Sequence, residues 1–345
     1  MDKILDYRSD TVTQATPAMR QAMMQAEVGD DILGEDPTVK RLESVGAAMF
    51  GKEAGLFVIS GTMANQVAVM ALTQRGDEVL VGEESHIYNL EVGGLAALSG
   101  VQARVLRATE GRFDVRAVKA AIRPSGIQTA VTRLLCLENT YDLNRGIPLP
   151  PEYMEQMCEL AHEAGLTVYL DGARVFNAAA VLGVDSRTLC APVDAMQVCL
   201  SKGLAAPVGS LLLGSTEFIA KARWIRQRLG GGMRQAGHMA AAGLVAMETM
   251  TKRLVEDHEN ARMLAEGLAA IDERLVDLTI PMTNVVQIEF GPLGLCSEDV
   301  VSRLLQRGVK VKPIGPTACR MITHWGISKH DIEETLAIMQ EMLTS

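Results

Sequence analysis

The sequence lacks three features that mark large classes of proteins: a long basic run, a C-x-x-C pair and an apolar stretch of membrane-span length, roughly 18 residues. Its formal net charge of −9 gives it no electrostatic footprint for a nucleic acid. Its N-terminus has no apolar segment typical of a signal peptide. We therefore expect a soluble, cytoplasmic protein with neither nucleic acid nor membrane as a partner.

The six cysteines have none of the spacings typical of zinc binding or of a redox pair. Cys136 and Cys199 lie inside apolar runs that we interpret as buried strands. We interpret the cysteines as small apolar core residues in a reducing compartment, and not as a disulfide framework.

What the sequence does contain is ample material for a large core, since 48% of its 345 residues are hydrophobic. This length fits two unequal domains better than one. Short apolar runs alternate with helical stretches, and we predict as strands residues 56–59, 78–81, 104–106, 134–137, 167–170, 196–200 and 210–213. The alternation is typical of an α/β domain with a mainly parallel sheet, here of seven strands, and helices on both faces.

Three segments are expected along the chain. These are an N-terminal segment packed on the large domain (1–15), the large domain itself (16–250) and a small α+β C-terminal domain (251–345). The boundary falls in a long helix-prone segment, residues 240–270. In the small domain we predict strands near 284–290 and 320–323 and helices near 297–306 and 329–342. A well-marked helix in the large domain begins after Asp36 as N-cap, with Pro37 in its first turn, and ends near Gly51.

Two polar motifs directly follow predicted strands: Asp171-Gly172-Ala173-Arg174 and Ser201-Lys202-Gly203. Open α/β sheets bind ligands at the carboxyl ends of their strands, so both motifs point to one crevice. A lysine amine forms a Schiff base with pyridoxal phosphate (PLP), and a carboxylate keeps the pyridine nitrogen protonated so that the ring accepts electrons. The pair predicts a PLP site with Lys202 and Asp171 as catalytic residues. The alternatives are a snorkelling lysine at a strand end and a carboxylate that caps the helix starting near Arg174.

A third motif, Ser60-Gly61-Thr62, comes directly after the strand at 56–59 and opens a helix. Its backbone N–H groups and the hydroxyls of Ser60 and Thr62 suit a phosphate at the positive end of that helix. The other interpretation is a simple N-cap. The lysine motif downstream favours the cofactor phosphate.

His86 follows the predicted strand at 78–81, at the same edge of the sheet. A flat imidazole there can cover the pyridine ring and accept a proton. The alternative is an ordinary surface or capping histidine.

Arginines supply two further candidate contacts. Arg320 interrupts an apolar strand of the small domain, where a guanidinium holds a substrate carboxylate or forms an interdomain salt bridge. Arg228 and Arg234 flank the glycine run at 230–232. We expect them either to approach a phosphate, in a neighbouring subunit, or to face solvent.

With these segments together, the chain resembles the low-specificity L-threonine aldolases, PLP-dependent transferase-like enzymes of the aspartate-aminotransferase fold type (fold type I). The motifs that carry the resemblance are Arg8-Ser9-Asp10-Thr11-Val12-Thr13, Gly29-Asp30-Asp31, Gly34-Glu35-Asp36-Pro37-Thr38, Ser60 to Asn65, Glu138-Asn139-Thr140, Leu170 to Arg174, Ser201-Lys202-Gly203, Ala206 to Ser210 and Gly230 to Gln235. The resemblance implies Lys202 as the Schiff-base lysine, Asp171 as partner of the ring nitrogen and His86 as the stacking residue.

The resemblance also implies Ser9, Arg174 and Arg320 around the substrate carboxylate and the cofactor hydroxyl. It further implies a homotetramer, a dimer of dimers with shared active sites, in which Arg228 and Arg234 are the candidates to be borrowed. The phosphate contacts that it implies are Ser60, Gly61 and Thr62. It leaves open whether a metal ion is bound.

One position departs from the family pattern. The family commonly has a second histidine after Glu138-Asn139-Thr140, where this chain has Tyr141. We expect Tyr141 to contact substrate, but a phenol with an unperturbed pKa of about 10 is a poor base at neutral pH. The identity of the base and the substrate preference are therefore open.

The function that the resemblance implies is reversible retro-aldol cleavage by a carbon–carbon lyase (aldehyde-lyase). The substrates would be L-threonine, L-allo-threonine and related β-hydroxy-α-amino acids, and the products glycine and an aldehyde. The alternatives are a PLP-dependent β-eliminating lyase or aminotransferase, both of which begin by removing the Cα proton, and a catalytically inactive PLP-binding homologue.

Overall fold

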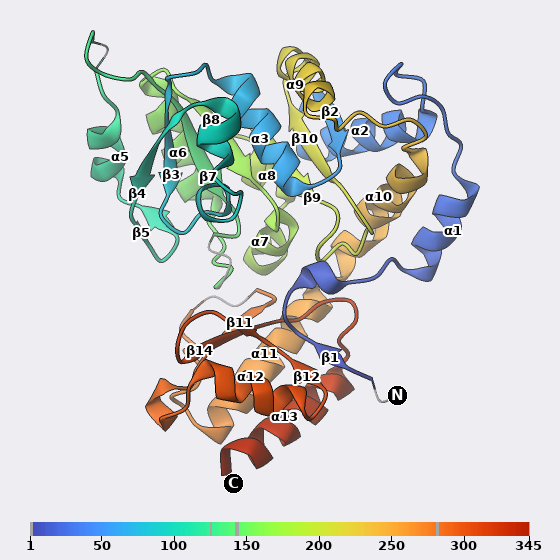
Figure 1. Ribbon diagram of the computed structural model, residues 1–345, viewed down its shortest axis with the longest axis vertical. Coiled ribbons are helices and arrows are strands. Elements are labelled where there is room, and N and C mark those ends of the chain that lie inside the picture. The colour runs from blue at the N-terminus through green and yellow to red at the C-terminus, as the bar shows by residue number, and fades with distance from the viewer. Residues whose placement is uncertain (1–2, 125, 142–144, 281–282, 345) are drawn as a thin grey trace.

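A seven-stranded sheet forms the centre of the larger of two units (Figure 1). The computed structural model describes residues 3–124, 126–141, 145–280 and 283–344. In spatial order the strands are β2 (Ala54–Val58), β10 (Ser210–Gly214), β9 (Ala195–Cys199), β8 (Thr167–Asp171), β7 (Thr132–Glu138), β3 (Glu78–Gly82) and β4 (Gln102–Leu106). In this sheet β10 is antiparallel to both of its neighbours, β2 and β9, and the other neighbouring strands are parallel to one another. The predicted α/β fold is confirmed, and each predicted strand begins within two residues of the observed one.

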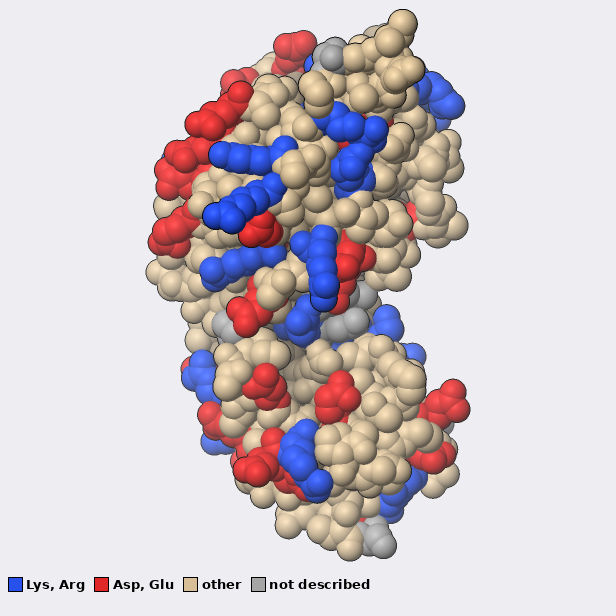
Figure 2. Space-filling model, turned by 90° about the vertical axis from the view of Figure 1, so that its left-hand side faces the viewer, with Lys and Arg blue, Asp and Glu red and all other residues tan. Residues whose placement is uncertain are grey.

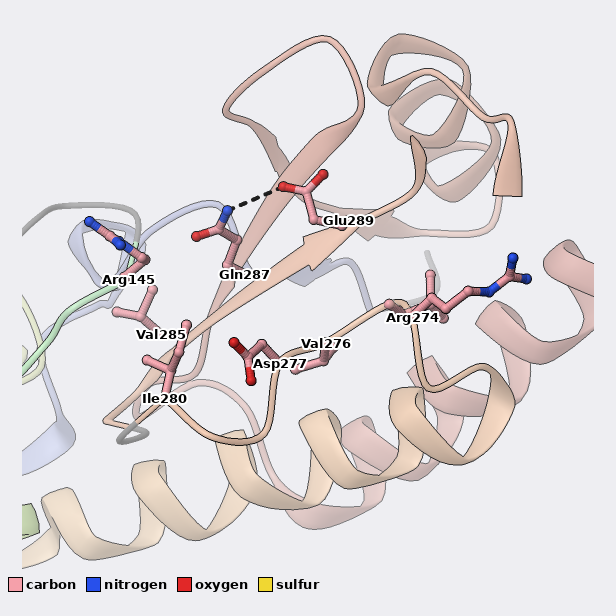
Figure 3. Close-up of a pocket in the computed structure, with 9 residues that line it drawn as sticks. Arg145, Arg274, Val276, Asp277, Ile280, Val285, Gln287 and Glu289 are labelled. Atoms are coloured by element: carbon pink, nitrogen blue, oxygen red, sulfur yellow. Dashed lines mark hydrogen bonds between the residues drawn. The ribbon is translucent and has the colours of Figure 1, made fainter. Parts of the chain in front are cut away.

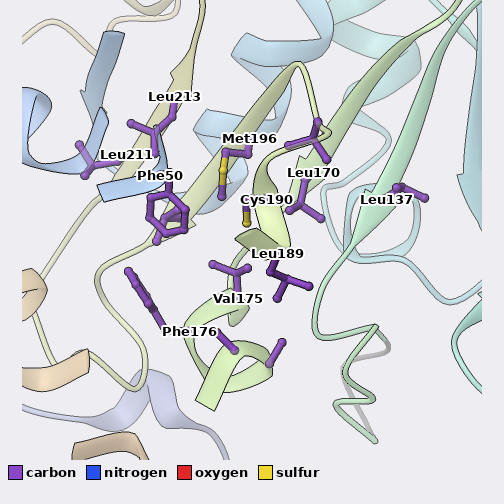
Figure 4. Packing of buried hydrophobic residues seen from close by; sticks show 14 of the residues in the cluster. Phe50, Leu137, Leu170, Val175, Phe176, Leu189, Cys190, Met196, Leu211 and Leu213 are labelled. Carbon is purple, nitrogen blue, oxygen red and sulfur yellow. The ribbon is translucent and has the colours of Figure 1, made fainter. Parts of the chain in front are cut away.

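Apolar side chains alternate between the two faces of the sheet. On β7, Leu135 and Leu137 belong to one core, and Leu134 and Cys136 belong to the other. The helices over the first core are α2 (Pro37–Phe50), α6 (Pro151–Glu163), α7 (Val175–Leu182), α8 (Ser186–Cys190) and α10 (Gly237–Thr249). Those over the second are α3 (Gly61–Leu72) and α9 (Thr216–Arg228). Figure 4 shows part of the first core. Each fully buried aliphatic side chain there stabilises the fold by about 1.5–3 kcal/mol relative to an exposed one.

Smaller elements complete the large unit. They are α1 (Pro17–Gln25), α4 (His86–Asn89), a π-helical turn (Leu95–Ser99), the antiparallel pair β5 (Ala108–Thr109) and β6 (Arg112–Phe113), and α5 (Val115–Ala121).

The helix predicted after Asp36 is confirmed, and its ends explain why. The Asp36 side chain accepts hydrogen bonds from the backbone N–H groups of Thr38 and Val39, and Pro37 occupies the first turn. The helix ends at Phe50 because Gly51 takes the left-handed conformation, with φ of 66°.

The smaller unit contains the antiparallel strands β11 (Val285–Glu289), β14 (Ala318–Ile322) and β13 (Lys312–Pro313). Its helices are α11 (Leu254–Ile271), α12 (Ser297–Leu305) and α13 (Lys329–Thr344). They enclose a separate apolar core. The two strands and two helices predicted for this part of the chain are confirmed.

The helix-prone segment 240–270 forms α10 and α11, which are separated by a 3-10 segment, Met250–Arg253. One sequence prediction needs correction. The N-terminal segment does not pack entirely on the large unit. Its strand β1 (Leu5–Asp6) pairs with β12 (Val309–Lys310), and Leu5 and Tyr7 are buried in the core of the small unit. We keep a division near residue 250 as a proposal.

Both units carry mixed surface charge. Figure 2 shows basic and acidic side chains interspersed on the face that it presents, over the large unit and the small one. Within the residues that the structure describes, no helix is long and apolar enough to cross a bilayer.

Candidate active site

The candidate site lies where β7, β8 and β9 end and helix α3 begins. Glu138 is the last residue of β7 and Asp171 the last of β8, and the two are paired in register. On β9, Gln197 is paired with Asp171. Because side chains alternate along a strand, these residues lie on the same face as Cys136, Tyr169 and Ala195, which is the face covered by α3.

Asp171 is surrounded by N–H donors. Its Oδ1 accepts hydrogen bonds from the side-chain amide of Gln197 and from the backbone N–H of Ala173 at 3.1 Å. Its Oδ2 accepts one from Nδ2 of Asn65 at 2.8 Å. The side chain is buried. These donors hold the carboxyl group in one position, and this geometry suits a partner for a protonated ring nitrogen. The predicted alternative, a helix cap, does not describe it, because the residue at the N-cap of α7 is Arg174.

His86 is the first residue of α4 and is held at two points. Its ring Nδ1 lies 2.9 Å from Oε1 of Glu91, and its backbone N–H donates to Oε2 of Glu138 at 2.7 Å. The ring is about one quarter exposed, at 26%, whereas the Glu91 side chain is fully buried. His86, Glu91 and Asp171 each place a ligand-capable atom within 4.8 Å of the others, so the structure brings His86 to Asp171.

The two carboxyl groups near His86, on Glu91 and Asp171, are held by amide groups of the protein. They accept hydrogen bonds from Asn65, Gln66 and Gln197. These hydrogen bonds use part of the acceptor capacity that a cation would need.

Glu138 has an electrostatic environment unlike that of Asp171. Burial raises the pKa of Glu138 to about 8, and the negative charge of Asp171 adds to the rise. The His86 N–H and the positive charges of Lys202 and Arg174 act in the opposite direction. Glu138 is therefore a buried acid that holds its proton at neutral pH, beside a carboxylate that is solvated by amides.

Lys202 follows β9, as predicted, and is half-buried. Its backbone oxygen accepts a hydrogen bond from Oγ1 of Thr13 at 2.9 Å. Its charge lowers the pKa of two carboxyls, Asp10 and Glu138, which places the amine in the same crevice as the ends of β7 and β8.

Arg174 forms a buried bidentate pair with Asp10. Its Nε and Nη2 donate to the two carboxylate oxygens at 2.8 and 2.7 Å. Burial alone would raise the pKa of Asp10, but the charge and hydrogen bonds of Arg174 hold it well below its usual value. Ser9 lies next to this pair and donates from Oγ to Asp10 at 3.4 Å. A guanidinium already in a bidentate pair has fewer donors left for a substrate.

Ser60 and Gly61 open α3 next to the Asp171 network. Ser60 is the N-cap, since its Oγ accepts the N–H of Met63 at 3.1 Å, so the capping interpretation is confirmed. The first N–H groups of the helix, at Gly61 and Thr62, still have no acceptor within the helix. A Cβ added to Gly61 would come 3.5 Å from the amide of Gln197. Gln197 therefore lies next to the predicted phosphate site at Gly61 and also donates a hydrogen bond to Asp171.

Arg320 lies on β14 in the small unit and is almost fully buried, at 1% exposed. Its Nη2 donates to the backbone oxygen of Arg8 at 3.0 Å, so it connects the N-terminal segment with the small sheet. Lys312 and Gln287 are its register partners on the neighbouring strands.

Two predicted residues, Arg228 and Arg234, lie at the surface, and a third, Tyr141, is buried beside the turn that precedes His86. Arg228 is exposed at the end of α9, and Arg234 is 64% exposed and pairs with Asp30 at 2.7 Å. Tyr141 is 1% exposed and belongs to a core, where its hydroxyl accepts the N–H of Glu84 at 3.2 Å. The residues that follow it, 142–144, lie outside the described part of the chain.

A cavity of about 300 Å³ lies elsewhere, against β11 in the small unit (Figure 3). Figure 3 shows Arg145 at one end and Arg274 at the other, with the Gln287–Glu289 hydrogen bond between them. As far as the described residues go, its lining includes no residue predicted for the site. The polar groups there have ordinary local partners, such as Asp272 for Arg274, so we place the candidate site by its chemistry at the strand ends.

Sequence reasoning missed four residues of the cluster as site candidates: Asn65, Glu91, Glu138 and Gln197. Asn65 and Glu138 belong to motifs that carry the family resemblance. Gln197 is a polar residue inside an apolar strand, which is a signal that the sequence does contain. Nothing in the sequence distinguishes Glu91 from a surface glutamate, because charged residues usually face solvent.

Comparisons with known proteins point in one direction. A family model described as beta-eliminating lyase matches residues 6–290. The low-specificity L-threonine aldolase 1 of Arabidopsis thaliana is 44% identical over 346 residues, which cover 99% of this chain and 97% of the relative. The threonine aldolase of Leishmania major has the same fold, with a TM-score of 0.85 at 17% identity, over 98% of this chain and 99% of that one. A structure of SPT (serine palmitoyltransferase) with PLP is similar in fold, with a TM-score of 0.76 at 17% identity, over 98% of this chain and 87% of that one.

Proposed function

The chain belongs to the beta-eliminating lyase family and, within it, to the low-specificity L-threonine aldolases; from this premise we propose that it is a PLP-dependent aldehyde-lyase. Its substrates are L-threonine, L-allo-threonine and related β-hydroxy-α-amino acids, and its products are glycine and an aldehyde. The family implies dependence on PLP.

The residues at the strand ends fit PLP. Asp171, with amide donors on both oxygens, is suited to bind the protonated ring nitrogen, and Lys202 is suited to bind the aldehyde. The start of α3, at Ser60, Gly61 and Thr62, is suited to bind the phosphate. When bound, PLP supplies a ring that stabilises the electron pair left on Cα after a bond to Cα breaks.

One observation carries the proposal most directly. The buried Asp171 carboxylate is held by Asn65 from α3 and by Gln197 from β9, and His86 lies beside it. A buried anion that is fixed by neutral amides lacks a countercharge of its own, so it is prepared for a cationic partner.

The substrate carboxylate is assigned to Arg320, with Ser9 and Arg174 at the same end of the crevice. A guanidinium that holds the carboxylate in two hydrogen bonds also fixes rotation about the Cα–N bond. The bond to Cα that stands perpendicular to the cofactor ring is the one that breaks. We assign to this end of the site the choice of Cα–Cβ cleavage over loss of the Cα proton.

Proton transfer is assigned to His86. Its Nε2 takes the proton of the β-hydroxyl, directly or through a water molecule, while the Cα–Cβ bond breaks and the aldehyde carbonyl forms. Cα is then protonated to give glycine. General-base catalysis of this kind contributes typically about 10²–10⁴-fold in rate.

We also propose a homotetramer whose active sites are shared between subunits. Arg228 and Arg234 are exposed in the single chain, and the glycine loop between them lies against α3, since a Cβ at Gly231 would clash with Met63. The exposed guanidinium of Arg228 suits a phosphate in a neighbouring subunit, and that of Arg234 would exchange its surface pair with Asp30 for the phosphate.

The test is the identity of the products from L-threonine. We expect acetaldehyde and glycine in equal amounts. Formation of 2-oxobutanoate and ammonia, or transfer of the amino group to a keto acid, without acetaldehyde would identify the protein as a β-eliminating lyase or an aminotransferase instead.

A further inference from the structure

A continuous set of hydrogen bonds joins the His86 ring to Asp171. Asn65 is at its centre: Nδ2 donates to Oδ2 of Asp171 at 2.8 Å and to Oε1 of Glu91 at 2.6 Å. Glu91 in turn lies 2.9 Å from Nδ1 of His86. The two residues assigned to the cofactor ring, one for its nitrogen and one for its face, are therefore linked through Asn65 and Glu91.

The orientation of the Asn65 amide follows from Tyr169. Burial raises the pKa of the Tyr169 hydroxyl well above its ordinary value, so this group remains a donor. It donates to Oδ1 of Asn65 at 2.8 Å. With the oxygen occupied in this way, both N–H bonds of the amide point to carboxylates, one to Asp171 and one to Glu91.

Glu91 is surrounded by groups that donate hydrogen bonds. Its Oε1 accepts from Asn65 and its Oε2 from the side-chain amide of Gln66. A carboxylate can accept all of these hydrogen bonds and one more from an imidazole N–H. The arrangement therefore favours the His86 ring as donor in the third contact, through Nδ1–H.

This arrangement determines which imidazole nitrogen is basic. A neutral imidazole carries one proton, so a proton on Nδ1 leaves Nε2 as an acceptor. Among the described residues the ring contacts Glu91 through Nδ1 and not through Nε2, and it is 26% exposed. Nε2 is thus the nitrogen presented to the crevice.

On the basis of the proposed function, we propose that Glu91 is a positioning residue that fixes the tautomer and orientation of His86, and that Asn65 couples it to Asp171. Glu91 acts through His86 and does not touch the substrate. Burying the Glu91 carboxylate costs free energy unless its hydrogen-bond partners are in place. The His86 ring is one of these partners, so the contact favours one position of the ring.

The test is a double-mutant cycle on the intact protein with PLP bound. Glu91→Gln removes the charge but keeps the shape, and we expect a loss in kcat of at least about tenfold with KM for L-threonine nearly unchanged. His86→Phe keeps a flat ring without nitrogens. In the His86→Phe background, Glu91→Gln should cause no further loss of kcat, because its effect passes through the imidazole. Equal losses in both backgrounds would overturn the proposal.

The matched control is Glu43→Gln. Glu43 is also a buried glutamate that accepts a backbone N–H, from Phe57 at 2.9 Å, but its charged partner is Arg223, outside the site. We expect this variant to lose stability and to keep the kcat of the unmodified protein. A loss of kcat in Glu43→Gln as large as that in Glu91→Gln would show a general effect of buried charge and contradict the proposal.

A second variant decides the matter if Glu91→Gln does not fold or does not retain PLP. Glu91→Asp keeps the charge and draws it away from Nδ1 by one methylene, so we expect a lowered kcat with PLP content retained. A kcat equal to that of the unmodified protein would overturn the role of Glu91. The unmodified protein is assayed in parallel: no acetaldehyde from it would contradict the proposed function, whereas normal activity of every Glu91 variant would contradict only this inference.

Discussion

The carboxyl groups of Glu138 and Asp171 end neighbouring parallel strands as register partners, yet their surroundings are different. Asp171 accepts hydrogen bonds from Asn65, Gln197 and the N–H of Ala173. Glu138 accepts the N–H of His86 and is deeply buried. Glu138 is therefore a buried acid whose pKa is raised, beside a carboxyl group that three N–H donors hold in one position.

The stability of the protein should depend on pH through Glu138. Its folded-state pKa of about 8 lies above the ordinary value of 4.5, so the folded state holds this proton more tightly than the unfolded chain does. The resulting stabilisation is complete below pH 4.5 and is lost as the pH rises through 8. Glu138→Gln mimics the protonated form. We expect its free energy of unfolding in urea to fall less than that of the unmodified protein between these two pH values.

Glu163→Gln is the control for this experiment, because it removes one negative charge at an exposed position of α6. Its pH dependence should follow that of the unmodified protein. If all three proteins show parallel pH dependences, Glu138 does not carry the proton that we assign to it.

The Asp10–Arg174 pair should stabilise the fold strongly. Asp10→Asn leaves the buried guanidinium of Arg174 without a countercharge, and breaking a buried pair in this way costs about 3–5 kcal/mol. Asp6→Asn is the matched control in the same segment, since the partner there, Arg8, is half exposed. That change should cost less than about 1 kcal/mol. Equal losses in guanidinium unfolding experiments would contradict the difference in burial.

Tyr141 should act on the turn that precedes His86 more than on substrate. Its hydroxyl accepts the N–H of Glu84, and its ring packs edge-on against Phe113 at 6.2 Å between centroids. Tyr141→Phe keeps the ring packing, so we expect a loss of about 1 kcal/mol in the free energy of unfolding and little change in KM for L-threonine. A large rise in KM with an unchanged free energy of unfolding would contradict this role and support the substrate contact that the sequence predicts for Tyr141.

The sequence was sufficient to predict much of the fold. The strands at 78–81 and 167–170 are bounded by turn residues and, after Glu78 and Thr167 at their first positions, consist of apolar and aromatic residues, as is typical of parallel strands buried on both faces. Lys202 and Asp171 could be singled out because each follows such a strand, and strand ends meet at one edge. The break at Met250–Arg253 could not be predicted, since this segment contains no Gly or Pro to mark the end of a helix.

Contacts between residues that are far apart in the sequence could not be predicted either. Leu5 pairs with Val309, and no local pattern specifies that partner. Glu91 is buried only because Asn65 and Gln66 of α3 are packed over it, so its sequence neighbourhood does not distinguish it from a surface glutamate. Networks of buried polar groups depend on such packing, and they are the part of a site that sequence patterns describe least.

The central claim is that Lys202 and Asp171 bind opposite parts of one PLP molecule, and borohydride reduction of the PLP-loaded protein tests it most directly. Reduction fixes the cofactor to the amine that holds it, and the modified lysine is then identified by peptide mapping. The account predicts a single modification at Lys202, which is lost in Lys202→Ala and retained in Lys40→Ala, a change at an exposed lysine of α2. A reducible adduct on another lysine in the unmodified protein, or its persistence in Lys202→Ala, would contradict the account.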